Sequence, residues 1–317
     1  MNIYLAYDTS CYTTSIACVN ENGQVLASCR KMLPVERGGR GLRQSEAVFK
    51  HIQQINEVNQ ELREKLRGLD CTVLAVGASV KPREAVDSYM PVFKVGEAFA
   101  EHLAQNYGVP FVASNHQQGH IYAAKHQSGL QAEKFLGFHL SGGTTELLYC
   151  AEKIHILSRT QDISAGQLID RIGVALGLDF PSGVYLEKLA EECLHFELKI
   201  PASVNLETGD CHYSGAETMA LNMIKKYSPN EVAFAVFHVV CSTVCKMIMI
   251  SCKKEQIQDV LLFGGVASSN LLRSMLIQRM HKLNPNIRLY FGKNEYSGDN
   301  AVGIALYTRK VCKDAAG

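Results

Sequence analysis

Short apolar segments of strand length open the chain, at residues 3–7, 15–19 and 24–29. The pair Asn22-Gly23 separates the last two segments and is a strong hairpin-turn signal. Three polar residues, Asp8, Thr9 and Ser10, lie between the first two segments. The pattern predicts three strands, and their first turn is either an ordinary turn or a place where a metal or a phosphate is bound.

Helical and buried-strand patterns follow. Apolar residues recur at spacings of three and four over residues 48–66, which predicts an amphipathic helix. Residues 71–80 are almost continuously apolar, as in a strand that is buried on both faces. Pro91 and Gly108 suit the two ends of a second helix, and residues 111–113 have the length of another short strand.

The second half of the chain repeats this plan. Residues 134–150 read as a strand, a turn of small polar residues and a second strand, as residues 4–18 do. Threonine pairs fall at the same place in both copies, and a third strand-like segment follows at residues 154–158. A period of about 130 residues is too long for a solenoid and indicates two duplicated domains. We place them at residues 1–130 and 131–317.

Two glycine-rich turns stand out in the second half. The turn Ser141-Gly142-Gly143-Thr144 joins two predicted strands, and its glycines would let backbone N–H groups approach a phosphate. It is neither a Walker A loop nor a GxGxxG motif, so it can equally be a plain tight turn. Gly264-Gly265 ends a buried strand, which is where ligands gather in open α/β sheets. We expect a flat ligand to approach the backbone there.

One stretch, residues 232–252, is long and apolar enough to consider as a membrane span. It contains polar residues, among them His238 and Lys246, so we interpret it as the buried central helix of a water-soluble domain. No basic region or signal-peptide core marks the start of the sequence. We therefore expect a cytoplasmic protein without a membrane partner.

Composition and charge narrow the class of protein. Apolar residues make up 47% and charged residues 20%, as in an ordinary globular enzyme. The net charge of +1 provides no global basic field, so a nucleic acid would need a local patch. The basic, glycine-rich residues 37–43 are such a patch or a solvated loop. Eleven cysteines without any CxxC motif favour reduced thiols over a disulfide framework or a zinc ribbon.

A pair of histidines follows the short strand at residues 111–113. His116 and His120 are four residues apart, so in a helix their imidazoles share one face and can bind one metal ion. A solvated or hydrogen-bonded pair is the alternative. A protease of the HExxH type would need a glutamate after the first histidine, where this chain has Gln117.

The order of these motifs resembles the actin/Hsp70/sugar-kinase superfamily and, more closely, a divergent member of the TsaD/Gcp family. This family comprises the tRNA threonylcarbamoyladenosine transferases once labelled O-sialoglycoprotein endopeptidases of the M22 type. The resemblance covers residues 3–310. It rests on seven ordered motifs: Asp8-Thr9-Ser10-Cys11, Asn115-His116-xxx-His120, Ser141-Gly142-Gly143-Thr144, Asp170, Gly183-xxx-Glu187-Lys188, Gly264-Gly265-Val266-Ala267-xx-Asn270 and Asp299-Asn300-Ala301.

The resemblance implies a duplicated α/β fold of two domains, each with a mixed five-stranded sheet, around a cleft. It also implies transfer of a threonylcarbamoyl group from threonylcarbamoyl-AMP to N6 of the adenosine beside the anticodon of tRNA. One iron or zinc ion would be held by His116, His120 and Asp299, and Asp8 would lie beside it in the catalytic centre. ATP or threonylcarbamoyl-AMP would be bound by a larger set: Thr9, Ser141, Gly142, Gly143, Thr144, Asp170, Gly183, Glu187, Gly264, Gly265 and Asn270.

Some positions depart from the family pattern. Tyr12 and Thr13 stand where the family has an acidic pair, Gln118 replaces a glutamate, and Thr144 follows the glycines directly where a histidine is usual. The alternative function is therefore a nucleotide- and metal-binding paralogue without transferase activity, acting as a regulatory or complex-forming subunit. A small-molecule kinase of the same superfamily is a third reading, with Asp8 as the only acid near its first phosphate turn.

The resemblance also names partners. We expect the anticodon stem-loop of tRNA and the other subunits of a threonylcarbamoyladenosine synthesis complex, in a heterodimer or a homodimer.

Apart from the resemblance, Asp299 has an ordinary explanation. It stands just before the last predicted helix, and an aspartate at such a position is most often a helix cap.

Overall fold

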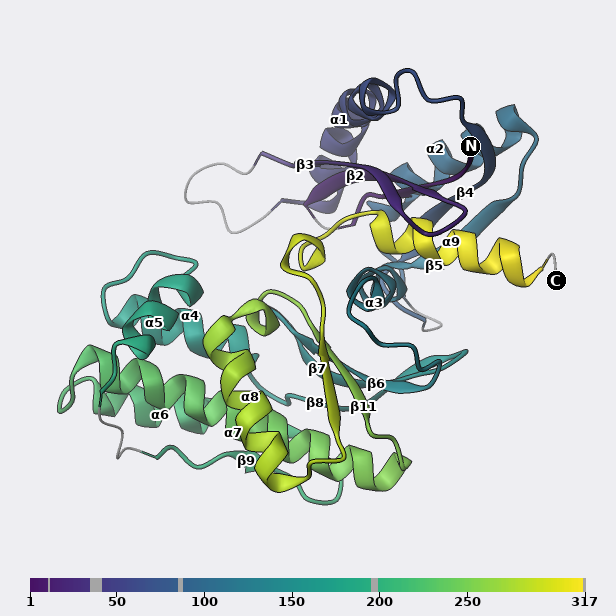
Figure 1. Cartoon of the computed structure of the whole chain (residues 1–317). Coiled ribbons are helices and arrows are strands. Elements are labelled where there is room, and N and C mark those ends of the chain that lie inside the picture. Colours follow the sequence, from purple (N-terminus) through teal and green to yellow (C-terminus); the bar gives the residue numbers. More distant parts are fainter. Residues whose placement is uncertain (11, 35–41, 85–87, 195–198, 316–317) are drawn as a thin grey trace. The chain divides into compact units, whose positions relative to one another are not determined.

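The computed structural model describes residues 1–10, 12–34, 42–84, 88–194 and 199–315. Cys11 and residues 37–41 of the basic loop, both noted in the sequence, lie outside these ranges. The chain forms two compact units (Figure 1). Unit 1 comprises residues 1–126 and 298–317, and unit 2 comprises residues 127–297.

Unit 1 is built on a mixed five-stranded sheet with the order β3-β2-β1-β4-β5. The strands are β1 (Asn2–Asp8), β2 (Thr13–Asn20), β3 (Val25–Met32), β4 (Thr72–Lys81) and β5 (Phe111–Asn115). The first three form the predicted antiparallel meander, whereas β4 and β5 run parallel to β1. The carboxyl ends of β1, β4 and β5 therefore meet at one edge of the sheet, which is where ligands collect in open α/β sheets.

Four helices cover this sheet: α1 (Gln44–Lys65), α2 (Phe93–Tyr107), α3 (His116–Lys125) and α9 (Val302–Asp314). Side chains alternate between the two faces of each strand, so Ile3, Leu5 and Tyr7 share one core with α1 and α2. On the other face α9 lies against the sheet and α3 packs beside it (Figure 1). Gly77 makes room for α9, because a Cβ there would lie 2.0 Å from Thr308 Oγ1.

Unit 2 repeats the sheet of unit 1. Its order is β12-β11-β6-β7-β8, in which the meander β6-β7-β8 corresponds to β1-β2-β3 and the parallel pair β11-β12 to β4-β5. The strands are β6 (Phe135–Leu140), β7 (Thr145–Cys150), β8 (Ile154–Arg159), β11 (Asp259–Phe263) and β12 (Arg288–Phe291). The duplication predicted from the sequence is confirmed by this shared topology.

The remaining elements belong to unit 2. They are α4 (Ala165–Ala175), α5 (Gly183–Glu191), α6 (Ser214–Met223), α7 (Pro229–Glu255), α8 (Asn270–Leu283), a short ribbon of β9 (Ser203–Val204) and β10 (Cys211–His212), and two 3-10 turns, η1 (Val266–Ser268) and η2 (Asn294–Tyr296). Residues from α4 to α8 and from one face of the sheet form a single large core.

Helix α7 is the long apolar stretch of the sequence. Ser228 caps it through a reciprocal pair of hydrogen bonds with Glu231, and Pro229 occupies its first position. It is the one helix among the described residues with the length and composition of a membrane span, yet 72% of its most apolar window is buried inside the fold. Its side chains, such as Val240 and Val244, lie at the centre of the core of unit 2. This burial agrees with the interpretation as a central core helix.

The two units differ from the division expected from the sequence, residues 1–130 and 131–317, in the last helix. Residues 298–317 belong to unit 1, because α9 buries Val302, Ile304 and Ala305 in that unit. A linear division cannot anticipate a terminal helix that returns to the first sheet.

Candidate metal centre and nucleotide loops

The histidine pair owes its position to the junction of β5 and α3. The strand ends at Asn115, whose side-chain oxygen accepts a hydrogen bond from Gln118 N at 2.8 Å and so caps the helix. His116 is the first helical residue, and His120 follows one turn later on the same face. The cap therefore places the first imidazole at the carboxyl edge of the sheet of unit 1.

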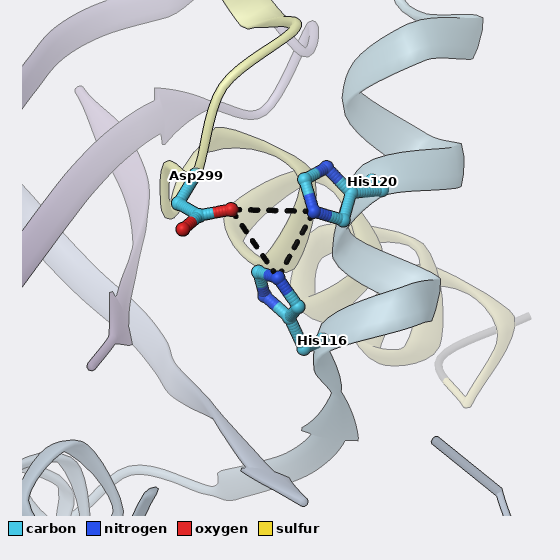
Figure 2. Close-up of side chains that lie close together, drawn as sticks. All are labelled: His116, His120 and Asp299. Carbon is cyan, nitrogen blue, oxygen red and sulfur yellow. Dashed lines mark hydrogen bonds and ion pairs between the residues drawn. The ribbon is translucent and has the colours of Figure 1, made fainter. Parts of the chain in front are cut away.

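Asp299 reaches the same place from the segment before α9. Its neighbour Asn300 accepts a hydrogen bond from Val302 N at 3.0 Å and donates one to Gly298 O at 2.7 Å. Asn300 thus accepts a hydrogen bond from the first turn of α9 and acts as the helix cap, the role that the sequence alone suggested for Asp299. The carboxylate of Asp299 is left to face the two imidazoles (Figure 2).

Three ligand atoms gather here (Figure 2). Nε2 of His116 lies 2.9 Å from Nε2 of His120, and Asp299 Oδ1 lies 3.4 and 3.5 Å from these two nitrogens. These separations are short enough for one ion with zinc-like bond lengths of about 2.0–2.2 Å to be held by all three atoms. Among the described residues this is the one group of at least three histidine, cysteine or acidic side chains with such spacing. The donor set and its size fit one divalent metal ion.

The charges around the site stabilise each other. Burial alone would lower the pKa of His116, but the Asp8 and Asp299 carboxylates outweigh it and raise its pKa to about 10. Burial alone would raise the pKa of Asp299, but hydrogen bonds from His116 and His120 hold it well below its usual range. Without a metal, both ring nitrogens of His116 are therefore protonated at neutral pH and the ring is positively charged. A bound cation would replace that charge.

A close approach of two helices sets the distance between the histidines and Asp299. A Cβ on Gly303 of α9 would lie 1.7 Å from Gly119 O of α3, and a Cβ on Gly119 would lie 2.7 Å from Ile304 Cδ1. Only glycine allows the two backbones to come this close. Gly119 lies between the two histidines in sequence, so this contact brings the start of α9 against the ligand-bearing face of α3.

The polar turn after β1 lies next to the histidines. Asp8 is buried, and its Oδ2 lies 2.9 Å from His116 Nδ1. Thr9, which the resemblance assigns to the nucleotide, is buried and donates to Val92 O at 2.8 Å, while it accepts from Gly96 N at 3.0 Å. Its hydroxyl therefore joins the turn to the start of α2.

The equivalent turn of unit 2 is more open. Ser141 Oγ accepts from Thr144 N at 3.1 Å, and Ser164 Oγ donates to Gly142 O at 2.6 Å, so the loop is fixed to the start of α4. Apart from the adjacent residues of the loop, no atom of the described residues lies within 4 Å of the places where a Cβ on Gly142 or Gly143 would be. The backbone of these glycines is therefore accessible to a ligand group such as a phosphate.

Gly264 and Gly265 follow β11, which is the strand next to β6. Gly264 has φ +101°, and a Cβ there would lie 2.3 Å from Leu140 O, so this position requires glycine. The contact packs the turn after β11 against the end of β6, directly before Ser141. Gly265 has open space on its Cβ side. The two glycine turns of unit 2 thus lie side by side.

The other predicted nucleotide positions belong to helices of unit 2: Gly183 and Asn270 begin α5 and α8, whereas Asp170 and Glu187 lie within α4 and α5. Asp170 of α4 accepts a hydrogen bond from Ser182 N at 2.8 Å, directly before Gly183. Glu187 of α5 accepts from Leu271 N at 2.9 Å, directly after Asn270. Each carboxylate thus fixes the start of the next helix of the pair, α5 for Asp170 and α8 for Glu187. The structure brings these four positions together in two pairs.

The positions that depart from the family pattern are also placed. Tyr12 is partly exposed and accepts a hydrogen bond from Leu42 N at 3.4 Å, whereas Thr13 is buried. Gln118 accepts from Ser114 Oγ at 3.0 Å. Neither Tyr12 nor Thr13 offers a carboxylate, so these two positions bring no negative charge to this edge of the sheet.

Sequence reasoning missed several residues that support these loops. Ser79 of β4 donates to Asp8 Oδ1 at 2.5 Å, and Ser164 holds the loop at Gly142. Arg273 donates to Ala267 O at 2.7 Å and to Gly292 O at 2.8 Å, which fixes the turn after β11. Their only sequence signal was the helix-cap pattern at Ser164, because the other contacts join residues far apart in the chain.

Comparisons with solved structures agree with this fold. HypF of T. kodakarensis matches with a TM-score of 0.66 and 16% identity, over 98% of this chain and 48% of HypF, so the chain spans about half the length of that protein. A ROK family glucokinase from Streptomyces griseus, solved in complex with glucose and AMPPNP, matches with a TM-score of 0.53 and 12% identity, over 97% and 99% of the two chains. These similarities establish the duplicated actin/Hsp70/sugar-kinase fold.

Sequence comparisons are more specific. The chain is 30% identical to the tRNA N6-adenosine threonylcarbamoyltransferase of Geobacillus thermodenitrificans, over 95% of this chain and 89% of that protein. It is 26% identical to the enzyme of the same name from Limosilactobacillus fermentum, over 99% and 93%. The family model TsaD, tRNA N6-adenosine threonylcarbamoyltransferase, matches residues 89–306. The chain therefore belongs to the TsaD family, whose members are acyltransferase-type enzymes of tRNA modification.

Proposed function

We propose that this protein transfers a threonylcarbamoyl group from threonylcarbamoyl-AMP to N6 of the adenosine next to the anticodon of tRNA. Membership of the TsaD family supports this activity. The observation that carries the proposal is the convergence of His116, His120 and Asp299 on one small triangle of ligand atoms. Side chains from α3 and from the segment before α9 meet there, although they are far apart in sequence.

In the reaction, the N6 nitrogen forms a bond to the carbamoyl carbon, the bond from that carbon to the phosphate oxygen breaks, and AMP leaves with the electron pair. The N6 nitrogen also gives up one proton. His116, His120 and Asp299 would hold one iron or zinc ion. When bound, an ion with an open coordination position supplies Lewis acidity towards a carbonyl oxygen.

The loops of unit 2 would hold the nucleotide, either ATP or threonylcarbamoyl-AMP. The open backbone of Gly142, Gly143 and Gly265 provides N–H donors for a phosphate and for negative charge that develops on a reacting oxygen. Asp170 and Glu187 would accept hydrogen bonds from ribose hydroxyls or from an amino group of the base. The acceptor adenosine must leave the stacked anticodon loop to react.

The proposed partners follow from the reaction: a tRNA anticodon stem-loop and further subunits of a threonylcarbamoyladenosine synthesis complex, bound in a heterodimer or a homodimer. The described cysteines are all free thiols, which supports the cytoplasm as the location.

The experiment is mass spectrometry of tRNA nucleosides after the protein is incubated with unmodified tRNA, threonine, bicarbonate and ATP, together with candidate partner proteins. We expect threonylcarbamoyladenosine, and we expect none when His116→Ala replaces the wild type. Absence of the modified nucleoside with every combination of partners, together with tight ATP binding, would contradict transfer. It would instead support a nucleotide-binding regulatory or complex-forming subunit.

One observation favours that second function. Tyr12 and Thr13 occupy the positions of the acidic pair, so the turn beside the metal centre carries fewer charges than the family pattern provides. A metalloprotease has less support, because no glutamate follows His116 to act as a base. Gln118 is not a base either, and its side-chain oxygen accepts a hydrogen bond from Ser114. A kinase has less support as well, because Asp8 faces His116 and Ser79 and not an open space.

A further inference from the structure

The carboxylate of Asp8 is held almost completely inside unit 1. The residue is 1% exposed, and it ends β1 at the edge of the sheet where α3 begins. A buried carboxylate is stable only when hydrogen bonds or opposite charges replace its water. Its side chain is bonded to Ser10, Ser79 and His116, which all belong to unit 1.

One oxygen of Asp8 is fixed by the sheet. Oδ1 accepts a hydrogen bond from Ser79 Oγ at 2.5 Å and another from Ser10 N at 3.0 Å. Ser79 lies on β4, the strand next to β1, so the neighbouring strand and the following turn hold the carboxylate from two sides. Because both groups donate to Oδ1, this oxygen acts only as an acceptor, and the orientation of the side chain is determined.

The other oxygen faces the histidine pair. Oδ2 lies 2.9 Å from Nδ1 of His116, within hydrogen-bond distance. A neutral imidazole has one N–H donor and one acceptor nitrogen, and the partner of one nitrogen decides which is which. In the neutral form, which a metal ligand must adopt, an N–H directed to Asp8 leaves the lone pair of His116 Nε2 towards His120 and Asp299.

We propose that Asp8 is a positioning residue of the metal centre and that Ser79 fixes it in that role. Asp8 holds the Nδ1–H tautomer of His116, sets the orientation of the ring and increases the basicity of Nε2 through its negative charge. This inference rests on the proposed metal site. It assigns Asp8 to neither the metal nor the substrate, in contrast to the catalytic role expected from the sequence.

The geometry separates this role from direct ligation. Asp8 Oδ2 lies on the Nδ1 side of the His116 ring, whereas the atoms that converge are Nε2 of each histidine and Asp299 Oδ1. Its remaining oxygen already accepts from Ser79 and Ser10. With an ion bound, Asp8 and His116 would form a carboxylate–histidine–metal chain, in which loss of the outer carboxylate typically weakens metal binding by about 10–100-fold.

The first test compares Asp8→Asn with the wild type. The asparagine amide has two possible orientations. If its oxygen accepts from His116 Nδ1–H, its NH₂ group faces the N–H group of Ser10, so that two donors oppose each other. If the amide is turned round, its NH₂ group faces His116 Nδ1 and can no longer accept the proton of that N–H group. We expect Zn²⁺ affinity, measured by competition with a chromophoric chelator, to fall by about 10–100-fold. The visible spectrum of the Co²⁺ form should change as the His116 ring loses its fixed orientation.

Ser79→Ala and Asp162→Asn make the comparison specific. Ser79→Ala keeps the carboxylate but removes one of its supports, so a smaller loss of Zn²⁺ affinity is expected. Asp162 is a carboxylate of unit 2 that accepts from the backbone of Tyr213 and Ser214. Asp162→Asn therefore removes a supporting carboxylate elsewhere and should leave Zn²⁺ affinity and the Co²⁺ spectrum unchanged.

A spectroscopic measurement on the wild type makes the test independent of how the variants fold. With ¹⁵N-labelled histidine and Zn²⁺ bound, NMR should show His116, identified by its absence in His116→Gln, with a proton on Nδ1 and the metal on Nε2. Metal on Nδ1 would overturn the inference. So would equal Zn²⁺ affinity and equal Co²⁺ spectra in the wild type and Asp8→Asn. If the wild type binds neither ion, the proposed metal site itself fails, which is a different result.

Discussion

The polar turn after β1 and its duplicate after β6 have the same place in the same sheet topology but different contacts. In unit 1 the side chains of Asp8 and Thr9 are buried and bonded to β4, α2 and α3. In unit 2 the backbone of Gly142 and Gly143 is open. One copy supports a candidate metal centre, and the other remains accessible to a phosphate. Duplication of a fold thus does not preserve the use of its loops.

The substitution with the largest expected effect removes a proposed metal ligand in unit 1. His120→Ala removes one of the three proposed ligands and leaves His116 and Asp299, and two protein ligands would hold a divalent ion only weakly. We expect formation of threonylcarbamoyladenosine to fall more than about 100-fold, because metal-bound ligands act as a unit in catalysis. The measurement is single-turnover transfer followed by nucleoside mass spectrometry. Activity within a factor of two of the wild type would rule out a metal-dependent reaction at this site.

A smaller effect is expected from a substitution in the open glycine turn of unit 2. Gly142→Ala has open space for its Cβ, so the fold should tolerate it. The methyl group would occupy the space through which a phosphate approaches the backbone, and we expect ATP affinity to fall about tenfold, which is about 1.4 kcal/mol. Calorimetric titration measures the affinity, and metal content should stay unchanged. Unaltered ATP binding would show that the phosphate is bound elsewhere.

A third change tests how the metal ligands are brought together. Gly303→Ala places a Cβ 1.7 Å from Gly119 O, so α3 and α9 must move apart. We expect the free energy of unfolding to fall by about 1–3 kcal/mol, as in other overpacked contacts, and metal affinity to fall with it. Chemical denaturation and chelator competition measure the two quantities.

The matched control is Gly215→Ala, in α6, where the new Cβ would meet no atom of another part of the described chain within 4 Å. It should leave metal affinity unchanged and stability unchanged or slightly higher. Equal behaviour of the two variants would show that the close approach of α3 and α9 does not position Asp299.

The smallest effect concerns pH and uses Asp162 of unit 2. Burial alone would raise the pKa of Asp162, but hydrogen bonds from Ser214 and from the N–H group of Tyr213 outweigh it and lower the pKa from 3.8 to about 2. Its contribution to stability is therefore present above pH 3.8 and is lost as the pH falls towards 2. We expect Asp162→Asn to lower the free energy of unfolding at pH 7 by about 1–3 kcal/mol. The difference from the wild type should shrink at pH 2–3 in urea denaturation, and a constant difference would contradict this origin.

Local patterns were sufficient to predict most of the fold. The apolar stretch at residues 232–252 corresponds to α7, and the strand, turn and strand at residues 134–150 correspond to β6 and β7, because periodicity and turn residues act over short distances. The duplication followed from the same signals. The return of α9 to unit 1 could not be predicted, because it depends on a long-range contact between Gly77 and Thr308.

In the candidate site, too, the features set by local spacing were predicted and those set by long-range contacts were not. The spacing of His116 and His120 predicted a pair on one helical face, and this geometry is observed. Only the family resemblance suggested Asp299 as a third ligand, since nothing near it in sequence distinguishes it from a helix cap. The contact between Asp8 and His116 joins residues more than a hundred positions apart, so no local pattern could reveal it.

The most direct test is metal and nucleotide analysis of the protein purified without a histidine tag, beside its His116→Ala variant. We expect about one iron or zinc ion per wild-type chain, no transition metal in the variant and equal ATP affinity in both, because the proposed metal ligands belong to unit 1 and the proposed nucleotide loops to unit 2. A wild-type protein without a transition metal, or a variant that keeps it, would contradict the proposed metal centre.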